Sequence, residues 1–322
     1  MTARRRVLQA MAGVLLGAGG AGAQAPRRVP VIGFLTTGGI DSLAQFREAM
    51  RDLGYAEGRD MRIERRSTEG RAGGLDLLAA ELVRLQPDVI YATGPAAVRA
   101  ARAATSTIPI VVLDLETDPV AAGLVASLAR PGGNLTGLFL DQPALAGKWL
   151  ELAAEVLPGR KRVALLNERA AGKAQLSAAQ AAGQRLGFTL QVIDFDHVEA
   201  MFAGLDSAAA NGAQAVVMLT SPMISNNSKR LAEWAVARRM PGISPFRAFA
   251  DAGGLMSYGP DLLAFRRFSA TYVDRILKGA RPGDLPIQQP ARFLFVVNQR
   301  AAQALGIALP APLLLRADEV IA

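Results

Sequence analysis

The sequence predicts an α/β protein with two Rossmann-like lobes, each built around a parallel sheet. Short apolar runs rich in Val and Ile alternate along the chain with segments of helical periodicity. The alternation begins again near residue 148, after a segment that contains Pro and several Gly. Strands separated by helices are typical of βαβ units, whose strands lie parallel. A chain of 322 residues is long enough for two such lobes, each with its own core.

The first half of the chain shows four strand and helix pairs. In the first helix, Leu43, Phe46, Met50 and Leu53 share one face, and Gly54 follows as a left-handed cap. The strands are expected at residues 31–35, 61–65, 88–92 and 109–113, and the helices at 43–53, 75–85, 95–104 and 119–129.

The second half repeats the pattern with shorter strands toward its end. Pro282 and Pro286 indicate a linker after a long amphipathic helix that Gly279 closes. The strands are expected at residues 162–166, 189–194, 215–219, 242–246, 255–258 and 293–297, and the helices at 148–157, 176–186, 198–210, 231–239, 265–276 and 300–305.

The N-terminus has the pattern of a secretory signal. Arg4 to Arg6 are followed by an uncharged stretch, residues 11–22, that is too short to span a bilayer. We expect cleavage near Ala23 and a location in the periplasm. Both the Sec and the twin-arginine routes stay open, because Ala3 and Val7 depart from the twin-arginine pattern.

Composition excludes several classes of protein. The absence of cysteine excludes disulfides, Cys-ligated zinc, iron–sulfur clusters and thiol nucleophiles. The net charge is +8, but the basic residues are scattered and aromatic residues make up only 6%, so we expect no nucleic-acid binding. Beyond the signal there is no further apolar run of 18 or more residues, so we expect a soluble mature chain.

The candidate ligand contacts lie in loops after the strands. Ligands of doubly wound sheets bind beyond the carboxyl ends of the strands. Hydroxyl and amide groups can bind a polar molecule there, and Gly allows the backbone to approach it closely, although a Thr after a strand can equally be a helix cap. The candidates are Thr36, Thr37, Thr93, Gly94, Pro95, Asp118, Asn167, Thr220, Ser221 and Phe246.

Three acids follow the fourth strand at alternate positions. Asp114, Glu116 and Asp118 could bind a hard cation if they line one face of an extended segment. No Gly-spaced calcium loop accompanies them. We therefore prefer one cleft acid, Asp118, with solvated neighbours, and expect no metal site.

Signals of an enzyme are weak. Gly17 to Gly22 fits G-x-G-x-x-G formally, but it lies inside the signal and follows no strand. The chain has no P-loop and no G-x-S-x-G turn. His197 is its one histidine, and we interpret it as a surface residue at a helix start. We expect a protein that is not an enzyme, without catalytic residues or cofactor.

Several longer motifs resemble a known family. The most specific is DPVAAGLV at residues 118–125 with LARPGGNLTG at 128–137. The chain resembles an uncharacterised family of ABC-transporter substrate-binding proteins, some of which bind tryptophan or other aromatic amino acids. Further matches lie at residues 32–35, 46–48, 53–55, 257–261, 272–280, 284–290, 304–307 and 316–321.

The resemblance implies a type 1 periplasmic binding protein, with two lobes joined by a three-segment hinge. The crossings would lie near residues 137–138, 257–259 and 287–290. Tyr258 then joins the expected cleft contacts, beside Thr36, Gly94, Asp118, Asn167 and Ser221. The expected domains are a signal at 1–23, a first lobe at 29–137 plus 258–286, and a second lobe at 138–257 plus 287–322.

The functional hypothesis is capture of a small polar molecule, such as an amino acid, and its delivery to an ABC permease in the inner membrane. The acids at residues 114–118 exceed those of relatives, which would favour an ammonium group on the ligand. We expect a monomer. The alternatives are an extracytoplasmic ligand sensor for a membrane-bound kinase, and a periplasmic enzyme on the same scaffold.

Overall fold

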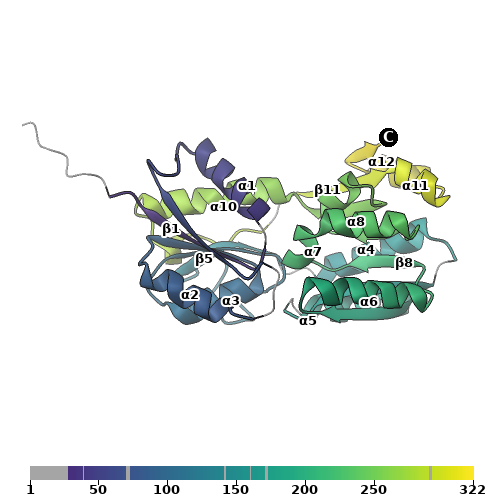
Figure 1. The fold of residues 1–322 in the computed structure, drawn as a ribbon, viewed down its shortest axis with the longest axis horizontal. Helices are drawn as coiled ribbons and strands as arrows, with labels where there is room; N and C mark the ends of the chain where they lie inside the picture. The colour runs from purple at the N-terminus through teal and green to yellow at the C-terminus, as the bar shows by residue number, and fades with distance from the viewer. Residues whose placement is uncertain are drawn as a thin grey trace, which may run out of the picture.

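Two sheets of mostly parallel strands, each covered by helices, form two lobes that lie side by side in the computed structural model (Figure 1). The structure describes residues 28–38, 40–69, 73–140, 143–159, 161–170, 173–289 and 292–322. The expected signal lies outside these residues. None of the helices in the described part of the chain is both long and apolar enough to cross a membrane.

The first lobe contains a five-stranded parallel sheet of order β2-β1-β3-β4-β5. Because β1 has β2 on one side and β3 on the other, the strand order reverses between β1 and β3. Thr36 and Thr93 are register partners at the carboxyl ends of these two strands. The strands are β1 (Val31–Thr36), β2 (Arg62–Ser67), β3 (Val89–Thr93), β4 (Ile110–Asp114) and β5 (Leu135–Phe139).

Helices cover both faces of this sheet. Phe46 and Met50 of α1 pack with Phe34 and Tyr91 on one face, where α10 also lies. Helices α2 and α3 cover the other face through small and apolar side chains such as Leu82. The helices are α1 (Ile40–Asp52), α2 (Leu75–Arg84), α3 (Pro95–Ala104) and α10 (Leu262–Leu277).

The second lobe contains a seven-stranded sheet of order β12-β11-β10-β9-β8-β6-β7. Its strands are parallel except between β10 and β11, which pair antiparallel. The expectation of parallel sheets therefore holds with this one exception. The strands are β6 (Arg162–Glu168), β7 (Thr189–Phe195), β8 (Ala215–Met218), β9 (Gly242–Ser244), β10 (Met256–Pro260), β11 (Phe293–Asn298) and β12 (Glu319–Ile321).

Two apolar layers sandwich this second sheet. Helices α6 and α8 pack on one face, and α4 and α5 pack on the other. Trp149 of α4 is fully buried in the second layer. The remaining elements are α4 (Pro143–Val156), α5 (Lys173–Leu186), α6 (Val198–Ala210), α7 (Pro222–Asn226), α8 (Ser228–Ala237), α9 (Arg247–Asp251), η1 (Pro282–Asp284), α11 (Gln299–Leu305) and α12 (Ala311–Arg316).

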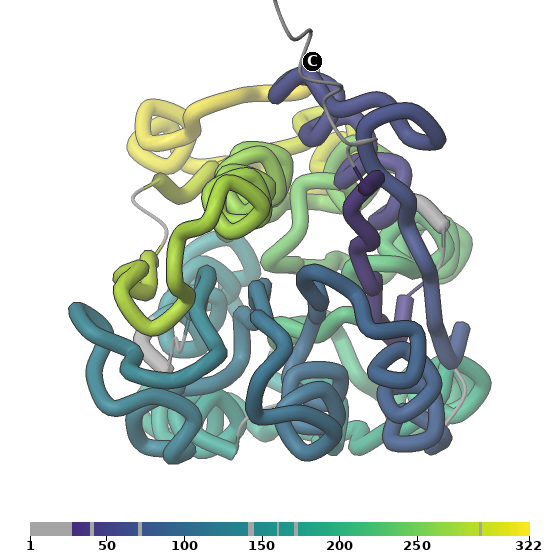
Figure 2. The backbone as a smooth tube through the Cα atoms, turned by 90° about the vertical axis from the view of Figure 1, so that its left-hand side faces the viewer, coloured from purple at the N-terminus to yellow at the C-terminus, as the bar shows by residue number. Residues whose placement is uncertain are grey.

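The chain passes between the lobes three times: from β5 to α4, from β10 to α10, and from η1 to β11. Figure 2 looks from the side of the first lobe, where yellow-green α10 lies beside earlier parts of the chain. Strand β10, which contains Tyr258, belongs to the second sheet, so the predicted division before residue 258 falls inside a strand. The domain limits are otherwise left as predictions.

One expected helix is wrong. Residues 119–123 form a turn, and residues 124–129 form bends and irregular structure. The side chain of Asp118 accepts hydrogen bonds from Val120 N (2.9 Å) and Ala121 N (3.0 Å), which closes a turn. Gly123 has a φ of 67°, a value that interrupts a right-handed helix.

Candidate ligand-binding cleft

A cleft lies between the lobes, at the carboxyl ends of strands in both sheets. It has an inner chamber of about 40 Å³ and an outer chamber of about 340 Å³. The two chambers are continuous, since six residues line both of them. These shared residues are Ser42, Ser225, Asn226, Phe246, Leu262 and Arg266.

The inner chamber is built at the strand-order reversal of the first sheet. Thr93 Oγ1 donates to Thr36 Oγ1 at 2.7 Å, and Gly38 N donates to the same oxygen at 2.9 Å. The second lobe contributes Ser221 and Pro222, at the start of α7. The chamber therefore presents hydroxyl groups from both lobes.

The lobes are in direct contact around this chamber. The carbonyl oxygen of Leu115 accepts hydrogen bonds from Gln175 Nε2 and Thr220 Oγ1, both at 3.4 Å. A Cβ atom on Gly94 would lie 2.6 Å from Pro222 Cγ, which is less than a van der Waals contact. The cleft is therefore closed at its inner end, and only glycine at position 94 permits this approach.

Three carboxyl groups lie at the inner end. Asp114 and Glu116 come from the first lobe and Glu168 from the second, and all three are buried. Burial raises the pKa of Glu116 well above its usual range, and the charges of Asp114 and Glu168 raise it further. Burial also raises the pKa of Asp114 and of Glu168, the latter against the effect of its hydrogen bond from Ser221.

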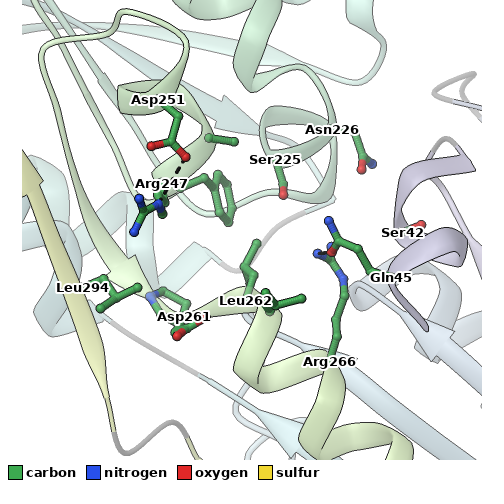
Figure 3. A pocket seen from close by; sticks show the side chains of 14 residues that line it. Ser42, Gln45, Ser225, Asn226, Arg247, Asp251, Asp261, Leu262, Arg266 and Leu294 are labelled. Carbon is green, nitrogen blue, oxygen red and sulfur yellow. Dashed lines mark hydrogen bonds and ion pairs between the residues drawn. The ribbon is translucent and has the colours of Figure 1, made fainter. Parts of the chain in front are cut away.

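The outer chamber is larger and is lined by both acidic and basic side chains (Figure 3). Arg247 Nε pairs with Asp251 Oδ2 at 3.2 Å, and Arg266 Nη1 donates to Gln45 Oε1. Phe246 and Leu262 give this region an apolar wall. The cleft can thus surround a molecule that has an apolar body and polar ends.

The structure brings together five of the predicted contacts. Thr36, Thr93, Gly94, Ser221 and Phe246 all line the inner chamber. Two more are direct chain neighbours of lining residues. Pro95 follows Gly94 and begins α3, and Thr220 precedes Ser221 and donates to the carbonyl oxygen of Leu115.

The other four predicted contacts are not among the lining residues. Thr37 is half-buried, and its Oγ1 makes no hydrogen bond to any described residue. Asn167 Nδ2 donates to Asp194 Oδ1 at 2.7 Å. Tyr258 stacks on Phe293, and Asp118 is exposed on its turn. Contacts with a ligand remain predictions for all eleven residues.

The expected exposure of the three acids at positions 114, 116 and 118 is wrong, because the structure shows the opposite pattern. Asp114 and Glu116 are buried, whereas Asp118, which we expected in the cleft, is exposed. The sequence also gave no signal for Arg266, which comes from α10 more than 200 positions after Thr36 in the chain. Residue spacing can suggest a loop as a site, but it does not show which helix of another segment covers that loop.

A larger hollow, of about 740 Å³, lies elsewhere on the first lobe. It is lined by Pro30, Asp88 and Pro109, each of which directly precedes a strand. Ligands of such sheets bind at the opposite, carboxyl ends. The cleft between the lobes is therefore the better candidate.

Comparison with known proteins assigns the family. The model of the family described as ABC transporter substrate binding protein matches residues 28–321. The chain belongs to this family. At the level of the family it is a solute-binding protein and not an enzyme. Within the described residues, no group of three His, Cys, Asp or Glu side chains is arranged to hold a metal ion.

Individual relatives are distant but cover most of the chain. A tyrosine-binding protein of Clostridioides difficile is 24% identical over 268 residues, which are 81% of this chain and 75% of the relative. A Streptococcus pneumonia structure, described as an ABC domain in complex with L-Trp, has a TM-score of 0.78 at 24% identity and covers 91% of this chain and 99% of its own.

A third relative is a ligand-free, open substrate-binding protein with adhesive properties from Clostridium difficile. Its TM-score is 0.57 at 22% identity, and the match covers 88% of this chain and 97% of that one. These likenesses establish the fold of two α/β lobes.

Proposed function

We propose that this protein is the extracytoplasmic substrate-binding component of an ABC importer, which captures an amino acid or a similar small polar molecule and delivers it to a permease. The observation that carries the proposal is a cleft lined by both lobes in a chain of this family. The relatives named for tyrosine and for L-Trp support an amino acid as the ligand.

Closure of the lobes is the proposed capture step. The open and closed forms differ in free energy by a few kcal/mol, roughly, and ligand contacts from both lobes favour the closed form. The higher TM-score against the L-Trp complex than against the ligand-free, open relative supports a closed arrangement here. The closed surface, formed by both lobes, then docks on the permease.

The arrangement of charge also fits an amino acid. Glu116 lines the inner chamber and has the buried Asp114 beside it, Arg247 lines the outer chamber, and Arg266 lines both. An ammonium group would lie at the inner end and a carboxylate toward Arg266. The apolar wall formed by Phe246 and Leu262 leaves room for a side chain.

The test is a ligand screen on the mature protein, purified without denaturation. Native mass spectrometry identifies a co-purified molecule, and thermal shift compares amino acids, nucleobases, sugars and small carboxylates. A true ligand at a hundredfold excess over its Kd adds about 2.7 kcal/mol of stability. Absence of any bound mass or shift would contradict the proposal, and consumption of the ligand would point to an enzyme instead.

A further inference from the structure

The outer chamber has two polar ends with an apolar centre. Figure 3 shows Arg247, Asp251 and Asp261 on one side of the chamber, Arg266 on the other side, and Leu262 between them. Arg266 also lines the inner chamber, whereas the other three polar residues line the outer chamber alone. We call the group of Arg247, Asp251 and Asp261 the distal end. A ligand whose head fills the inner chamber extends past Leu262 toward it.

Arg247 is held in one orientation at the distal end. Its Nη1 and Nη2 pair with the two carboxylate oxygens of Glu319, at 2.7 and 2.8 Å, and its Nε donates to Asp251 Oδ2 at 3.2 Å. A bidentate pair of this kind fixes the plane of the guanidinium group. Each terminal nitrogen carries two hydrogens, so the pair with Glu319 leaves one on each for another acceptor. The Arg247 side chain is 44% exposed, so a ligand in the chamber can reach it.

Glu319 holds Arg247 without lining the chamber itself. It belongs to the C-terminal strand β12, where it is the register partner of Val296 on β11. Asp318 fixes the start of this strand, because its Oδ2 accepts from Phe295 N and its own amide donates to Phe295 O, both at 2.8 Å. The last strand of the chain therefore determines where a cleft side chain lies.

Asp261 places an acceptor at the same end. It lies at the crossing from β10 to α10, and its Oδ1 accepts from the amide of Ala264 at 3.0 Å, which caps α10. A carboxylate can accept about four hydrogen bonds, so Asp261 can accept another from a ligand. The distal end thus presents a donor from the second lobe and an acceptor from the crossing.

This combination of groups selects the chemistry of what it binds. A carboxylate at the distal end would lie beside the carboxylates of Asp251 and Asp261, and an ammonium group would lie beside the guanidinium of Arg247. A hydroxyl group avoids both repulsions, because it accepts from Arg247 and donates to Asp261. The distal end therefore suits a neutral group that both donates and accepts.

The centre of the chamber suits an apolar spacer. Phe246 is buried, lines both chambers and directly precedes Arg247 at the start of α9. The outer chamber of about 340 Å³ has the volume of about eleven molecules of liquid water, enough for a benzyl side chain with a polar atom at its end. An aromatic ring between Phe246 and Leu262 would place that atom at the distal end.

We propose that the distal end is a specificity subsite, in which Arg247 donates to and Asp261 accepts from a hydroxyl group at the end of the ligand's side chain, and that Glu319 positions Arg247 for this contact. This inference rests on the proposed function and deepens it, because it names the ligand class. The ligand is an amino acid whose apolar side chain ends in a hydroxyl group, as in a phenol.

The first experiment varies the end of the side chain. Calorimetry on the wild type compares L-tyrosine with L-phenylalanine, O-methyl-L-tyrosine, 4-carboxy-L-phenylalanine and 4-aminomethyl-L-phenylalanine. L-Tyrosine should bind about ten- to a hundredfold more tightly than L-phenylalanine, since the latter leaves the distal groups unpaired. Equal affinity for these two, or tightest binding of a compound with a methoxy or charged end, would overturn the proposal.

The second experiment removes the distal groups. Arg247→Met keeps the length of the side chain, and should bring the affinity for L-tyrosine close to that for L-phenylalanine. Glu319→Gln should also lower the ratio of the two affinities, because it releases Arg247. A wild-type ratio in Arg247→Met would overturn the subsite, and a wild-type ratio in Glu319→Gln would overturn the positioning role of Glu319.

A matched control breaks a similar ion pair elsewhere. Glu155 of α4 accepts from Arg316 Nη2 at 2.7 and 2.5 Å, and neither residue is among those that line the cleft. Glu155→Gln should keep the wild-type ratio of the two affinities. An equal fall of the ratio in Glu155→Gln and Glu319→Gln would show a general loss of structure and overturn the assignment to Glu319.

The outcomes separate this inference from the function on which it rests. If none of the five amino acids binds but another solute of the thermal-shift panel does, the solute-binding function stands and the specificity subsite falls. If no solute binds at all, both fall.

Discussion

Gly94 is a position at which closure of the cleft depends on the absence of a single atom, Cβ. Its φ and ψ are 83° and 158°, a conformation that is essentially restricted to glycine. A Cβ there would also lie 2.6 Å from Pro222 Cγ in the other lobe, about 1 Å inside normal carbon contact. Gly94→Ala therefore has two effects, which can be measured separately.

The backbone strain exists in the open and the closed form, so it lowers the free energy of unfolding, by about 1–3 kcal/mol. The clash with Pro222 exists only in the closed form, so it lowers ligand affinity. Overpacking of this kind costs about 1–3 kcal/mol, which corresponds to about a 5- to 150-fold rise in Kd. Isothermal calorimetry with the ligand from the screen measures the Kd, and thermal unfolding measures stability.

Two further variants make this test specific. Gly123→Ala introduces a side chain at a φ of 67° with no atom within 4 Å, so it should lower stability and leave the Kd unchanged. Adding Pro222→Ala to Gly94→Ala should restore part of the lost affinity. An unchanged Kd in Gly94→Ala would refute the claim that ligand binding closes the cleft as the structure shows.

Three other predictions concern pH and stability. Because the pKa of Glu116 is raised, the folded protein keeps a proton that the unfolded chain releases above about pH 4.5. The free energy of unfolding therefore falls as pH rises from there through the pKa of the folded state. Glu116→Gln should show a smaller loss of Tm than the wild type between about pH 5 and pH 8. Gly137→Ala places a Cβ 2.3 Å from the carbonyl oxygen of Val112 at a φ of 134°, and should lose about 3 kcal/mol or more in urea unfolding. Tyr91→Phe removes the buried 2.7 Å hydrogen bond to Ser269 Oγ of α10, and should lose about 1 kcal/mol in the same assay.

Each of these predictions has its own control and a result that would contradict it. Glu233→Gln, which removes an exposed acid on α8, should follow the pH slope of the wild type, and an equal slope for Glu116→Gln would show that Glu116 does not retain its proton. Gly159→Ala, at a φ of 80° with no atom within 4 Å, should lose only about 1 kcal/mol, and an equal loss in Gly137→Ala would remove the role of the Val112 contact. Wild-type stability in Tyr91→Phe would mean that this hydrogen bond contributes nothing net.

The sequence predicted the features that depend on local patterns. Apolar periodicity gave most strands and helices, because a residue's place on a helix face or strand face follows from its spacing along the chain. The rule for the carboxyl ends of parallel strands then selected Thr36, Gly94 and Ser221, which line the inner chamber. Longer motifs gave the family, which the match over residues 28–321 confirms.

The tertiary structure decided which residues from distant segments meet. The alternation of acids along the chain could not show that Glu116 is buried and Asp118 exposed, because only the folded chain places the segment of Glu116 against the second lobe, where Gln175 and Thr220 donate to the carbonyl oxygen of Leu115. Likewise, α10 follows a strand of the second sheet but packs on the first, and so brings Arg266 to the cleft. Sequence spacing determines which side chains share a face, but only the folded chain determines what covers that face.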